Sequence, residues 1–202
     1  MMKHRLILAS GSPRRRQLLE MLGLSFDIIV TNADESFEPS LPPANIVREL
    51  AHRKASAAVR SITGSDERFV VVAADTVVVV DGDILGKPST EDEAIDMLTR
   101  LQGRHHDVYT GVAVYDSTTD KTIGASVQTR VWMHPRAKEW LTWYVRTGEP
   151  MDKAGSYAIQ GQGSLLVERI EGDFYNVVGL PVGKLDEIFT ELGLSIQSWM
   201  EA

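Results

Sequence analysis

The sequence predicts a mixed α/β fold in which helices cover a β-sheet. Segments with strand patterns and segments with helix patterns alternate along all 202 residues. The run over residues 69–74 is β-branched and apolar on both faces, as expected of a central strand that is covered on both sides. The turn signal Asp81-Gly82-Asp83 joins two strands into a hairpin, so some of the pairing should be antiparallel.

The first third of the chain supplies two strands and two helices. The apolar run over residues 5–9 predicts a buried strand. Ser12 suits the N-cap and Pro13 the first position of a helix that ends at Gly23. The elements expected after this helix are a strand over residues 26–30, a polar loop with three prolines over 31–43 and a helix over 44–62.

The remainder of the chain continues the same alternation. Thr90 and Glu93 form a capping-box pattern at the start of a helix that reaches about Leu101. Two strands follow around a polar turn, and then helices and a strand complete the chain. Their expected ranges are strands over 107–117 and 124–134, a helix over 136–148, a strand over 164–170 and a helix over 182–194.

Composition narrows the class of protein. The chain has no cysteine, which excludes disulfides, cysteine-ligated zinc and thiol nucleophiles. No apolar run approaches the ~18 residues that span a bilayer. The apolar run near the N-terminus, LILA, is too short to be the core of a signal peptide. We therefore expect a cytoplasmic protein with no membrane partner. The length of 202 residues suits one large domain, or two lobes that share a core.

The acidic balance limits the partners. A formal net charge of -7 argues against general nucleic-acid binding, which usually shows a basic face. It leaves room for a small anionic ligand, because charges more than about 10 Å apart are largely screened at physiological salt. A local cluster of cations can therefore outweigh a distant acidic surface.

Polar and cationic residues gather where the first predicted strand turns into the first predicted helix. Backbone N–H groups at a helix start carry about half a positive charge, and Gly11 lets the backbone approach a ligand closely. Ser10 and Ser12 add hydroxyl donors, and Arg14 and Arg15 add planar forks that suit phosphate oxygens. The alternative is that Ser12 only caps the helix and that the arginines are solvated.

These features together predict a phosphate-binding turn. It is not of the Walker type, because the Gly-x4-Gly-Lys-Ser/Thr spacing is missing. Of the three consecutive arginines, Arg16 is the one expected to point away from such a site.

Four charged residues elsewhere are further candidates. Asp75 directly follows the apolar run 69–74 and is expected at the end of this buried strand. A carboxylate there is poorly hydrated unless it is paired, metal-bound or facing a cleft; the alternative is that it caps a turn. Lys54 shares a helical stripe with apolar side chains, so it either snorkels to solvent or meets an anion. Lys87, between a glycine and a proline, and Glu35, in an acidic loop, would by themselves be surface residues.

The segment over residues 149–181 combines glycines, aromatic rings and amides. The rings and amides are Tyr157, Phe174, Tyr175, Gln160 and Asn176. Such a composition suits a loop that wraps a planar ligand and equally suits ordinary turns. The adjacent His105 and His106 would face opposite ways on a strand, so they give no metal-binding pattern and are expected to be structural or exposed.

Six segments, in order along the chain, resemble the Maf family of nucleoside triphosphate pyrophosphatases. They are LASGSPRR, AADTVV, GKP, VYTGV, EPMDKAGSYAIQG and GDFYNVVGLP, and they run from Leu8 to Pro181. The resemblance implies one domain over residues 1–202 with the inosine triphosphate pyrophosphatase-like fold. That fold is an elongated mixed β-sheet with flanking helices, in two lobes around a central nucleotide cleft.

The resemblance also implies roles for single residues. Asp75 matches the catalytic aspartate of the family's Ala-Asp-Thr motif. Positions that the family uses for substrate specificity match Arg14, Thr76 and Gln160. Cleft residues that the family links to phosphate or metal match Ser10, Arg15, Glu35, Lys54 and Lys87.

The activity implied is metal-dependent hydrolysis of a nucleoside triphosphate to the monophosphate and diphosphate. The segment DKAGSYAIQG is similar to the branch that acts on dTTP and UTP, with modified pyrimidine nucleotides as further candidates. A sister branch that acts on 7-methyl-GTP differs in this segment and is the alternative within the family. Family members often form homodimers, although no apolar stripe in this sequence demands one.

A mechanism follows as a hypothesis. Glu35 and Asp75 would hold Mg²⁺ or Mn²⁺, because hard cations prefer carboxylate and phosphate oxygens. Asp75 would also orient or deprotonate the attacking water. Two alternatives stay open at this point: a nucleotide-sensing regulator of cell division without turnover, and a nucleotidyl or sugar-phosphate transferase.

Overall fold

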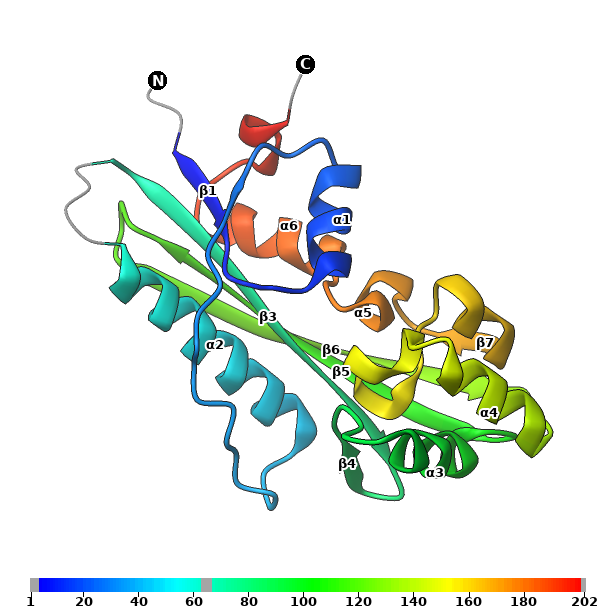
Figure 1. Ribbon diagram of the computed structural model, residues 1–202. Helices are drawn as coiled ribbons and strands as arrows, with labels where there is room; N and C mark the ends of the chain where they lie inside the picture. The colour runs from blue at the N-terminus through cyan, green and yellow to red at the C-terminus, as the bar shows by residue number, and fades with distance from the viewer. Residues whose placement is uncertain (1–3, 63–66, 201–202) are drawn as a thin grey trace. The chain divides into compact units, whose positions relative to one another are not determined.

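The computed structural model describes residues 4–62 and 67–200 (Figure 1). The strands are β1 (Arg5–Leu8), β2 (Asp27–Ile28), β3 (Phe69–Val80), β4 (Asp83–Leu85), β5 (His105–Asp116), β6 (Lys121–Met133) and β7 (Val167–Glu171). The α-helices are α1 (Pro13–Met21), α2 (Pro43–Ser61), α3 (Glu91–Leu101), α4 (Lys138–Arg146), α5 (Phe174–Val178) and α6 (Val182–Glu191). Short 3₁₀ helices cover Glu149–Asp152, Ala154–Ser156, Gly161–Leu166 and Ile196–Trp199.

The strands form one open sheet of mixed direction. Its order is β2-β1-β3-β5-β6-β7, and β4 pairs with β3 outside this path. Strand β1 pairs in parallel with both β2 and β3, whereas the pairs β3–β4 and β6–β7 are antiparallel. The mixed α/β sheet with flanking helices that the sequence predicts is therefore confirmed.

The chain divides into two compact units. The first unit contains Met1–Asp75, Thr110–Val127 and Gly179–Ala202, and the second contains Thr76–Tyr109 and Gln128–Val178. Three strands, β3, β5 and β6, contribute residues to both units.

In the first unit, helix α2 packs on the sheet through small side chains. It runs beside β3 in Figure 1, and its alanines form a core with apolar residues of β1, β3 and β5. That core includes Ala51, Ala55, Ala58, Ile7, Val71, Ala73 and Ala113. Because alternate side chains of a strand point to opposite faces, Leu6, Leu8, Val70 and Val72 face the other way, and they are buried as well. Both faces of the central strand are thus covered, as predicted.

Gly111 of β5 allows the backbone of α2 to approach the sheet closely. A Cβ atom on Gly111 would be 2.0 Å from the carbonyl oxygen of Val47 and 2.6 Å from the backbone nitrogen of Arg48. Backbone atoms cannot move aside as a flexible side chain can, so only glycine fits. Lys54 stands about two turns further along α2, and the contact at Gly111 therefore sets the distance of its helix from the sheet.

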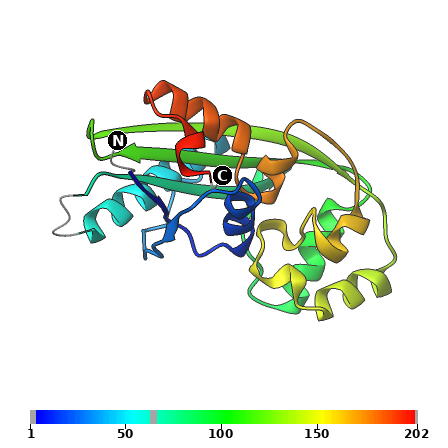
Figure 2. The ribbon, with the colours of Figure 1, turned by 90° about the horizontal axis from the view of Figure 1, so that it is seen from above.

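The second unit has a core of its own, around which α3, α4 and the 3₁₀ helices of residues 149–166 gather (Figure 2). Among its buried members are Val78, Leu98, Leu141, Tyr144 and Leu166. The cap predicted for α3 at Thr90 is confirmed, because the Thr90 hydroxyl accepts a hydrogen bond from the Glu93 N–H at 3.1 Å. The Glu93 carboxylate accepts from the Ser89 N–H at 2.6 Å, one residue before the position that a complete capping box uses. The strand expected over residues 164–170 begins only at Val167, since the residues before it form a 3₁₀ helix.

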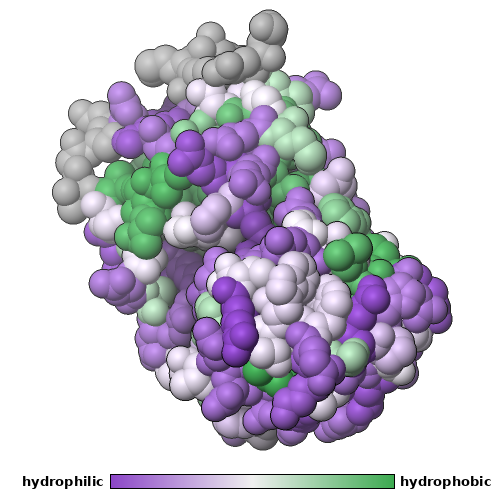
Figure 3. Space-filling model, turned by 45° about the vertical axis from the view of Figure 1, so that its right-hand side comes forward, coloured by the Kyte–Doolittle hydropathy of each residue, from purple (hydrophilic) through white to green (hydrophobic). Residues whose placement is uncertain are grey.

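Hydrophilic side chains cover most of the face shown in Figure 3, and apolar ones form small separate patches there. The large apolar side chains that stay exposed are Met21, Ile28, Val30, Phe37, Trp143, Leu165, Phe174 and Met200. Scattered exposure of this kind is normal for folded proteins. Within the described ranges, no helix combines the length and the hydropathy that crossing a membrane requires.

Candidate active site

The turn between β1 and α1 brings two serine hydroxyls to the start of a helix. Ser12 occupies the N-cap position and Pro13 the first helical position, as predicted, but the Ser12 hydroxyl makes no capping hydrogen bond. The Ser10 hydroxyl instead accepts a hydrogen bond from the Ser12 N–H at 3.2 Å. Ser10, rather than Ser12, therefore fixes the shape of this turn.

Arg15 connects the turn to another segment of the first unit. Its Nε donates to the carbonyl oxygen of Gly179 at 2.7 Å, and its Nη1 donates to the Ser10 hydroxyl at 3.2 Å. Arg16 instead pairs with Glu20 one turn along the exposed side of α1. The expectation that Arg16 points away from the turn is confirmed.

The charges around Arg15 act on one another. Burial of the guanidinium lowers the pKa of Arg15; the Asp75 carboxylate opposes that shift, Arg14 adds to it, and Glu35 opposes it. An arginine side chain stays protonated in proteins even when its pKa falls. Two carboxylates and a second arginine of the first unit thus lie within electrostatic reach of Arg15.

Lys54 meets both of these carboxylates. Its Nζ lies 2.5 Å from Asp75 Oδ1 and 2.7 Å from Glu35 Oε1. The Lys54 and Asp75 side chains are only 16% and 13% exposed, whereas Glu35 is 65% exposed. Of the two alternatives for Lys54, contact with an anion is confirmed.

Asp75 does not lie where its strand was expected to end. The β-branched run that follows it extends β3 to Val80, so Asp75 stands within the strand instead of after it. The alternative that Asp75 caps a turn is therefore wrong.

The loop that carries Glu35 is fixed from both sides. Arg53, next to Lys54 on α2, donates to the carbonyl oxygens of Ser36 at 2.5 Å and of Asp34 at 3.5 Å. The Asp34 carboxylate accepts hydrogen bonds from the N–H and hydroxyl of Ser36, at 2.9 and 2.8 Å. These bonds flank Glu35 and hold its backbone beside α2.

The two carboxylates suit a divalent cation. Glu35 and Asp75 converge on one point, since a single Lys54 Nζ contacts both. Mg²⁺ is usually held by one or two carboxylates together with substrate phosphates and water. Among residues 4–62 and 67–200, no cluster of three or more His, Asp or Glu side chains suitable for a metal is found. Two carboxylates are the kind and number of protein ligands that Mg²⁺ takes, and in this structure the Lys54 ammonium lies between them.

Three other residues predicted for the site belong to the second unit. Thr76 follows Asp75 on β3 and is half-buried, whereas Lys87 and Gln160 are exposed in turns. The Gly155 N–H donates to the carbonyl oxygen of Gly86 at 3.0 Å and so holds the turn that carries Lys87. The direct contacts among the predicted site residues described above link Ser10 to Arg15 and Lys54 to Glu35 and Asp75, all in the first unit.

Two residues of the glycine-rich segment serve the interior of the second unit. The Tyr157 hydroxyl lies 2.6 Å from His106 Nε2, and both side chains are buried. Asn176 Nδ2 donates to the carbonyl oxygen of Val108 at 3.1 Å and to the Thr129 hydroxyl at 2.9 Å. For Tyr157 and Asn176 the structural alternative therefore holds, as it does for His106.

Sequence reasoning missed two residues that hold the cluster in place. Arg53 had one usable signal, its position directly before Lys54 and one turn after Glu49, with which it pairs. Gly179 had none, because it contributes a backbone carbonyl, which every residue has.

The chain is thus an open, mixed α/β sheet protein in which Lys54 contacts the carboxylates of Asp75 and Glu35. The family model described as "Maf-like protein" matches residues 5–192. This match covers most of the chain, and the chain belongs to that family.

Several curated relatives are similar over almost their full lengths. A protein of Caldicellulosiruptor bescii is 47% identical over 192 residues, which cover 95% of this chain and 96% of the relative. One of Dictyoglomus thermophilum is 43% identical over 96% of this chain and 100% of its own length. One of Caldanaerobacter subterraneus subsp. tengcongensis is 50% identical over 91% of this chain and 87% of its own length. Each of the three is named dTTP/UTP pyrophosphatase.

Proposed function

We propose that this chain hydrolyses nucleoside triphosphates, dTTP and UTP before others, to the nucleoside monophosphate and diphosphate. The names of relatives at 43–50% identity support the substrates. The observation that carries the proposal is the position of the Lys54 ammonium between Asp75 and Glu35, the two carboxylates whose charges also act on Arg15.

The cations serve to bind the triphosphate. A nucleoside triphosphate brings close to four negative charges. Arg14, Arg15 and Lys54 supply three positive charges against the two negative charges of Asp75 and Glu35, so the cluster keeps one positive charge and the assigned divalent cation would bring it to three. Lys87 is assigned to the phosphates as well, on the basis of its sequence motif. Catalysis of phosphoryl transfer consists mostly of positioning and charge stabilisation, so such a cluster suits the reaction.

In the proposed reaction, a water oxygen attacks the α-phosphorus, and the bond from that phosphorus to the oxygen bridging to the β-phosphorus breaks. The Asp75 carboxylate accepts the proton that the water loses. Lys54 orients this carboxylate through the contact at 2.5 Å. The products are the monophosphate, which gains the oxygen of water, and diphosphate.

Glu35 and Asp75 are assigned as the protein ligands of Mg²⁺ or Mn²⁺. When bound, such a cation neutralises phosphate charge and lowers the pKa of the water that it coordinates. Selection of the base is assigned to Arg14, Thr76 and Gln160, with modified pyrimidine nucleotides as further candidate substrates.

The test is a panel of triphosphates with diphosphate detection, in ¹⁸O-labelled water, with Mg²⁺, Mn²⁺, Co²⁺ or a chelator. We expect dTTP and UTP to give diphosphate faster than CTP, ATP, GTP and 7-methyl-GTP, and the label to appear in the monophosphate. Saturable binding without diphosphate would favour a nucleotide sensor instead. A monophosphoryl product joined to a second compound would favour a transferase, and a preference for 7-methyl-GTP would favour the sister branch.

A further inference from the structure

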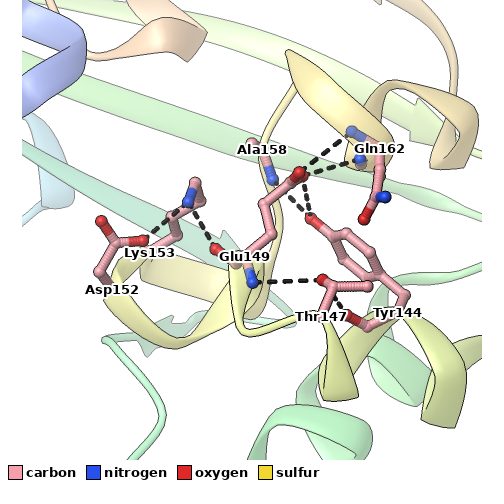
Figure 4. A network of polar contacts seen from close by, with 8 residues as sticks. Tyr144, Thr147, Glu149, Asp152, Lys153, Ala158 and Gln162 are labelled. Carbon is pink, nitrogen blue, oxygen red and sulfur yellow. Dashed lines mark hydrogen bonds and ion pairs between the residues drawn. The ribbon is translucent and has the colours of Figure 1, made fainter.

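Tyr144 and Glu149 of the second unit form a hydrogen-bonded pair, and Tyr144 also bonds Ala158 (Figure 4). The Tyr144 hydroxyl donates to Glu149 Oε1 at 2.9 Å. The same hydroxyl accepts a hydrogen bond from the N–H of Ala158, two residues before Gln160, at 3.3 Å. Tyr144 therefore fixes the backbone that leads into Gln160.

The partner of Tyr144 holds the chain on the other side. Glu149 accepts hydrogen bonds from the N–H of Gln162 at 3.1 Å and from that of Gly163 at 2.9 Å. These residues stand two and three positions after Gln160. One tyrosine and one glutamate thus hold both flanks of a short, exposed turn; we call them the Tyr144–Glu149 pair.

The pair is itself rigidly placed. Tyr144 is fully buried on α4. The Thr147 hydroxyl accepts from the Glu149 N–H at 3.2 Å, and Lys153 Nζ donates to the Glu149 carbonyl oxygen at 2.5 Å. Both ends of the Glu149 residue, its backbone and its carboxylate, are therefore fixed (Figure 4).

Close packing leaves the turn little freedom. A Cβ atom on Gly163 would lie 2.4 Å from the carbonyl oxygen of Ala158 and 2.4 Å from the Tyr144 hydroxyl. Gly163 therefore lets the two flanks of the turn touch each other and the pair at the same point.

The ionised form of Glu149 suits its partners, which are all hydrogen-bond donors. Partial burial raises the pKa of Glu149, but the hydrogen bonds from Gly163, Gln162 and Tyr144, together with the charge of Lys153, outweigh that effect and lower the pKa below its ordinary value. A carboxylate only accepts hydrogen bonds, and all three groups that point at it are donors.

We propose that Tyr144 and Glu149 are positioning residues for base selection, which hold the turn so that the Gln160 carboxamide meets the base in one orientation. The inference rests on the proposed function, in which Gln160 contributes to specificity. The imide edge of uracil or thymine places an N–H donor between two carbonyl acceptors. A carboxamide matches this edge with one acceptor and one donor only when its orientation is fixed.

The variants Tyr144→Phe and Glu149→Gln test the proposal. The first keeps the buried ring and removes the hydroxyl; the second keeps the length and turns one acceptor into a donor facing an N–H. We expect the ratio of kcat/KM for UTP to kcat/KM for ATP to fall about tenfold in each, mainly through KM for UTP, because misorientation weakens polar recognition. The matched controls are Tyr115→Phe, which loses only a bond to exposed Asp120, and Glu139→Gln, an exposed position on α4.

A double-mutant cycle separates positioning from a merely structural role. If the pair acts through Gln160, Glu149→Gln lowers the selectivity ratio in the wild type but lowers it no further in a Gln160→Ala background. The same loss in both backgrounds would overturn the proposal, as would unchanged selectivity in both single variants. Hydrogen exchange of the amides over residues 158–163, expected to quicken in both variants, shows that the turn has loosened.

Binding of non-hydrolysable α,β-methylene UTP and ATP, measured by calorimetry, separates this proposal from the proposed function. A wild-type protein that binds the UTP analogue selectively but releases no diphosphate would overturn the proposed hydrolysis. The role of the Tyr144–Glu149 pair would then be tested by the ratio of the affinities for the UTP and ATP analogues, compared between the wild type and the variants. If the variants hydrolyse UTP with the selectivity of the wild type, the positioning role of the Tyr144–Glu149 pair is overturned and the proposed hydrolysis stands. A protein that neither binds nor cleaves these nucleotides would overturn both.

Discussion

The two units hold their candidate residues by different physical means. In the first unit charged side chains meet directly, with Lys54 in contact with both Asp75 and Glu35. In the second unit Gln160 is held indirectly, because Tyr144 and Glu149 bond the backbone on either side of it. The first arrangement places charge, and the second places a segment of chain.

This difference predicts two kinds of defect. Coulomb interactions fall off gradually with distance, and every triphosphate carries the same charged tail, so changes at Lys54, Asp75 and Glu35 should affect all substrates alike. Hydrogen-bond recognition depends steeply on distance and angle, so changes in the second unit should alter the choice among bases. The following predictions test this division, from the largest expected effect to the smallest.

Asp75→Asn should have the largest effect. The amide keeps the shape of the carboxylate but cannot accept the proton of the attacking water, so kcat should fall at least about a hundredfold. The fall should be similar for dTTP, UTP and ATP in steady-state assays of diphosphate release. Asp96→Asn, at an exposed position on α3, is the control. Near-normal turnover in the Asp75 variant would remove this residue from catalysis.

Gly111→Ala should disturb the first unit through its packing. The added methyl group would collide with the backbone of Val47, 2.0 Å away, so α2 must shift. Overpacking of this kind costs about 3 kcal/mol, which corresponds to a fall in Tm of roughly 10 °C for a chain of this size. The shift also carries Lys54 away from Asp75, so kcat/KM should fall for all triphosphates.

Gly124→Ala provides the comparison for Gly111→Ala. Its added methyl group would lie 3.5 Å from the flexible Arg48 side chain, an ordinary contact. Thermal unfolding of the two variants, side by side, should show a large effect at Gly111 only. Equal stability would show that α2 can move away from the sheet at little cost.

His106 makes the second unit sensitive to acid. Burial lowers the pKa of His106 to about 4, with Asp107 opposing this shift and His105 adding to it. The unfolded chain, with a histidine pKa near 6.5, binds a proton more readily than the folded chain, so stability falls as the pH drops from about 6.5 through about 4. Between pH 8 and pH 5 this one group should remove about 2 kcal/mol from the free energy of unfolding.

Urea unfolding across this pH range measures the effect. In His106→Gln the difference in stability between pH 8 and pH 5 should shrink by that amount, even though the loss of the Tyr157 contact lowers stability at pH 8. His134→Gln, at an exposed position, should leave the pH dependence as it is. An unchanged slope in the His106 variant would show that this buried histidine does not titrate during unfolding.

The residues that could be predicted from the sequence are those whose side chains carry the signal. The start of α1 at Pro13 and the cap of α3 at Thr90 follow from side-chain preferences, and both are confirmed. Lys54 on an apolar stripe indicated an anionic partner, but the stripe alone could not say that the partners are Asp75 and Glu35.

The residues that could not be predicted act through the backbone or through distant contacts. Gly179 contributes a carbonyl oxygen and Ala158 an N–H, groups that all non-proline residues share. Tyr144 fits the apolar pattern of α4 equally well with or without a bonded hydroxyl, so its contact with Glu149 leaves no trace in the periodicity. The end of β3 was misplaced because Asp75 interrupts a β-branched run that continues past it.

Arg53→Met should have the smallest effect and sharpen the account of the first unit. Arg53 bonds the carbonyl oxygens on both sides of Glu35, so its loss removes two of the contacts that hold this loop to α2. If Glu35 helps to hold the cation, the Mg²⁺ concentration for half-maximal activity should rise about tenfold, the lower end of the range for losing an outer partner of a metal ligand, because Arg53 bonds the backbone beside Glu35 and not its carboxylate. The value of kcat at saturating Mg²⁺ should stay near that of the wild type.

Two further variants, a control and a direct test of Glu35, are needed to interpret the result for Arg53→Met. Arg60→Met, at an exposed position in the last turn of α2, should leave the Mg²⁺ dependence unchanged. Glu35→Gln removes the carboxylate itself and should raise the required Mg²⁺ concentration more than Arg53→Met does. If Glu35→Gln has no effect on the Mg²⁺ dependence, Glu35 is not a metal ligand, and its contact with Lys54 serves only to orient the lysine. If Glu35→Gln raises the required Mg²⁺ concentration and Arg53→Met does not, the bonds of Arg53 are not needed to hold Glu35 in place.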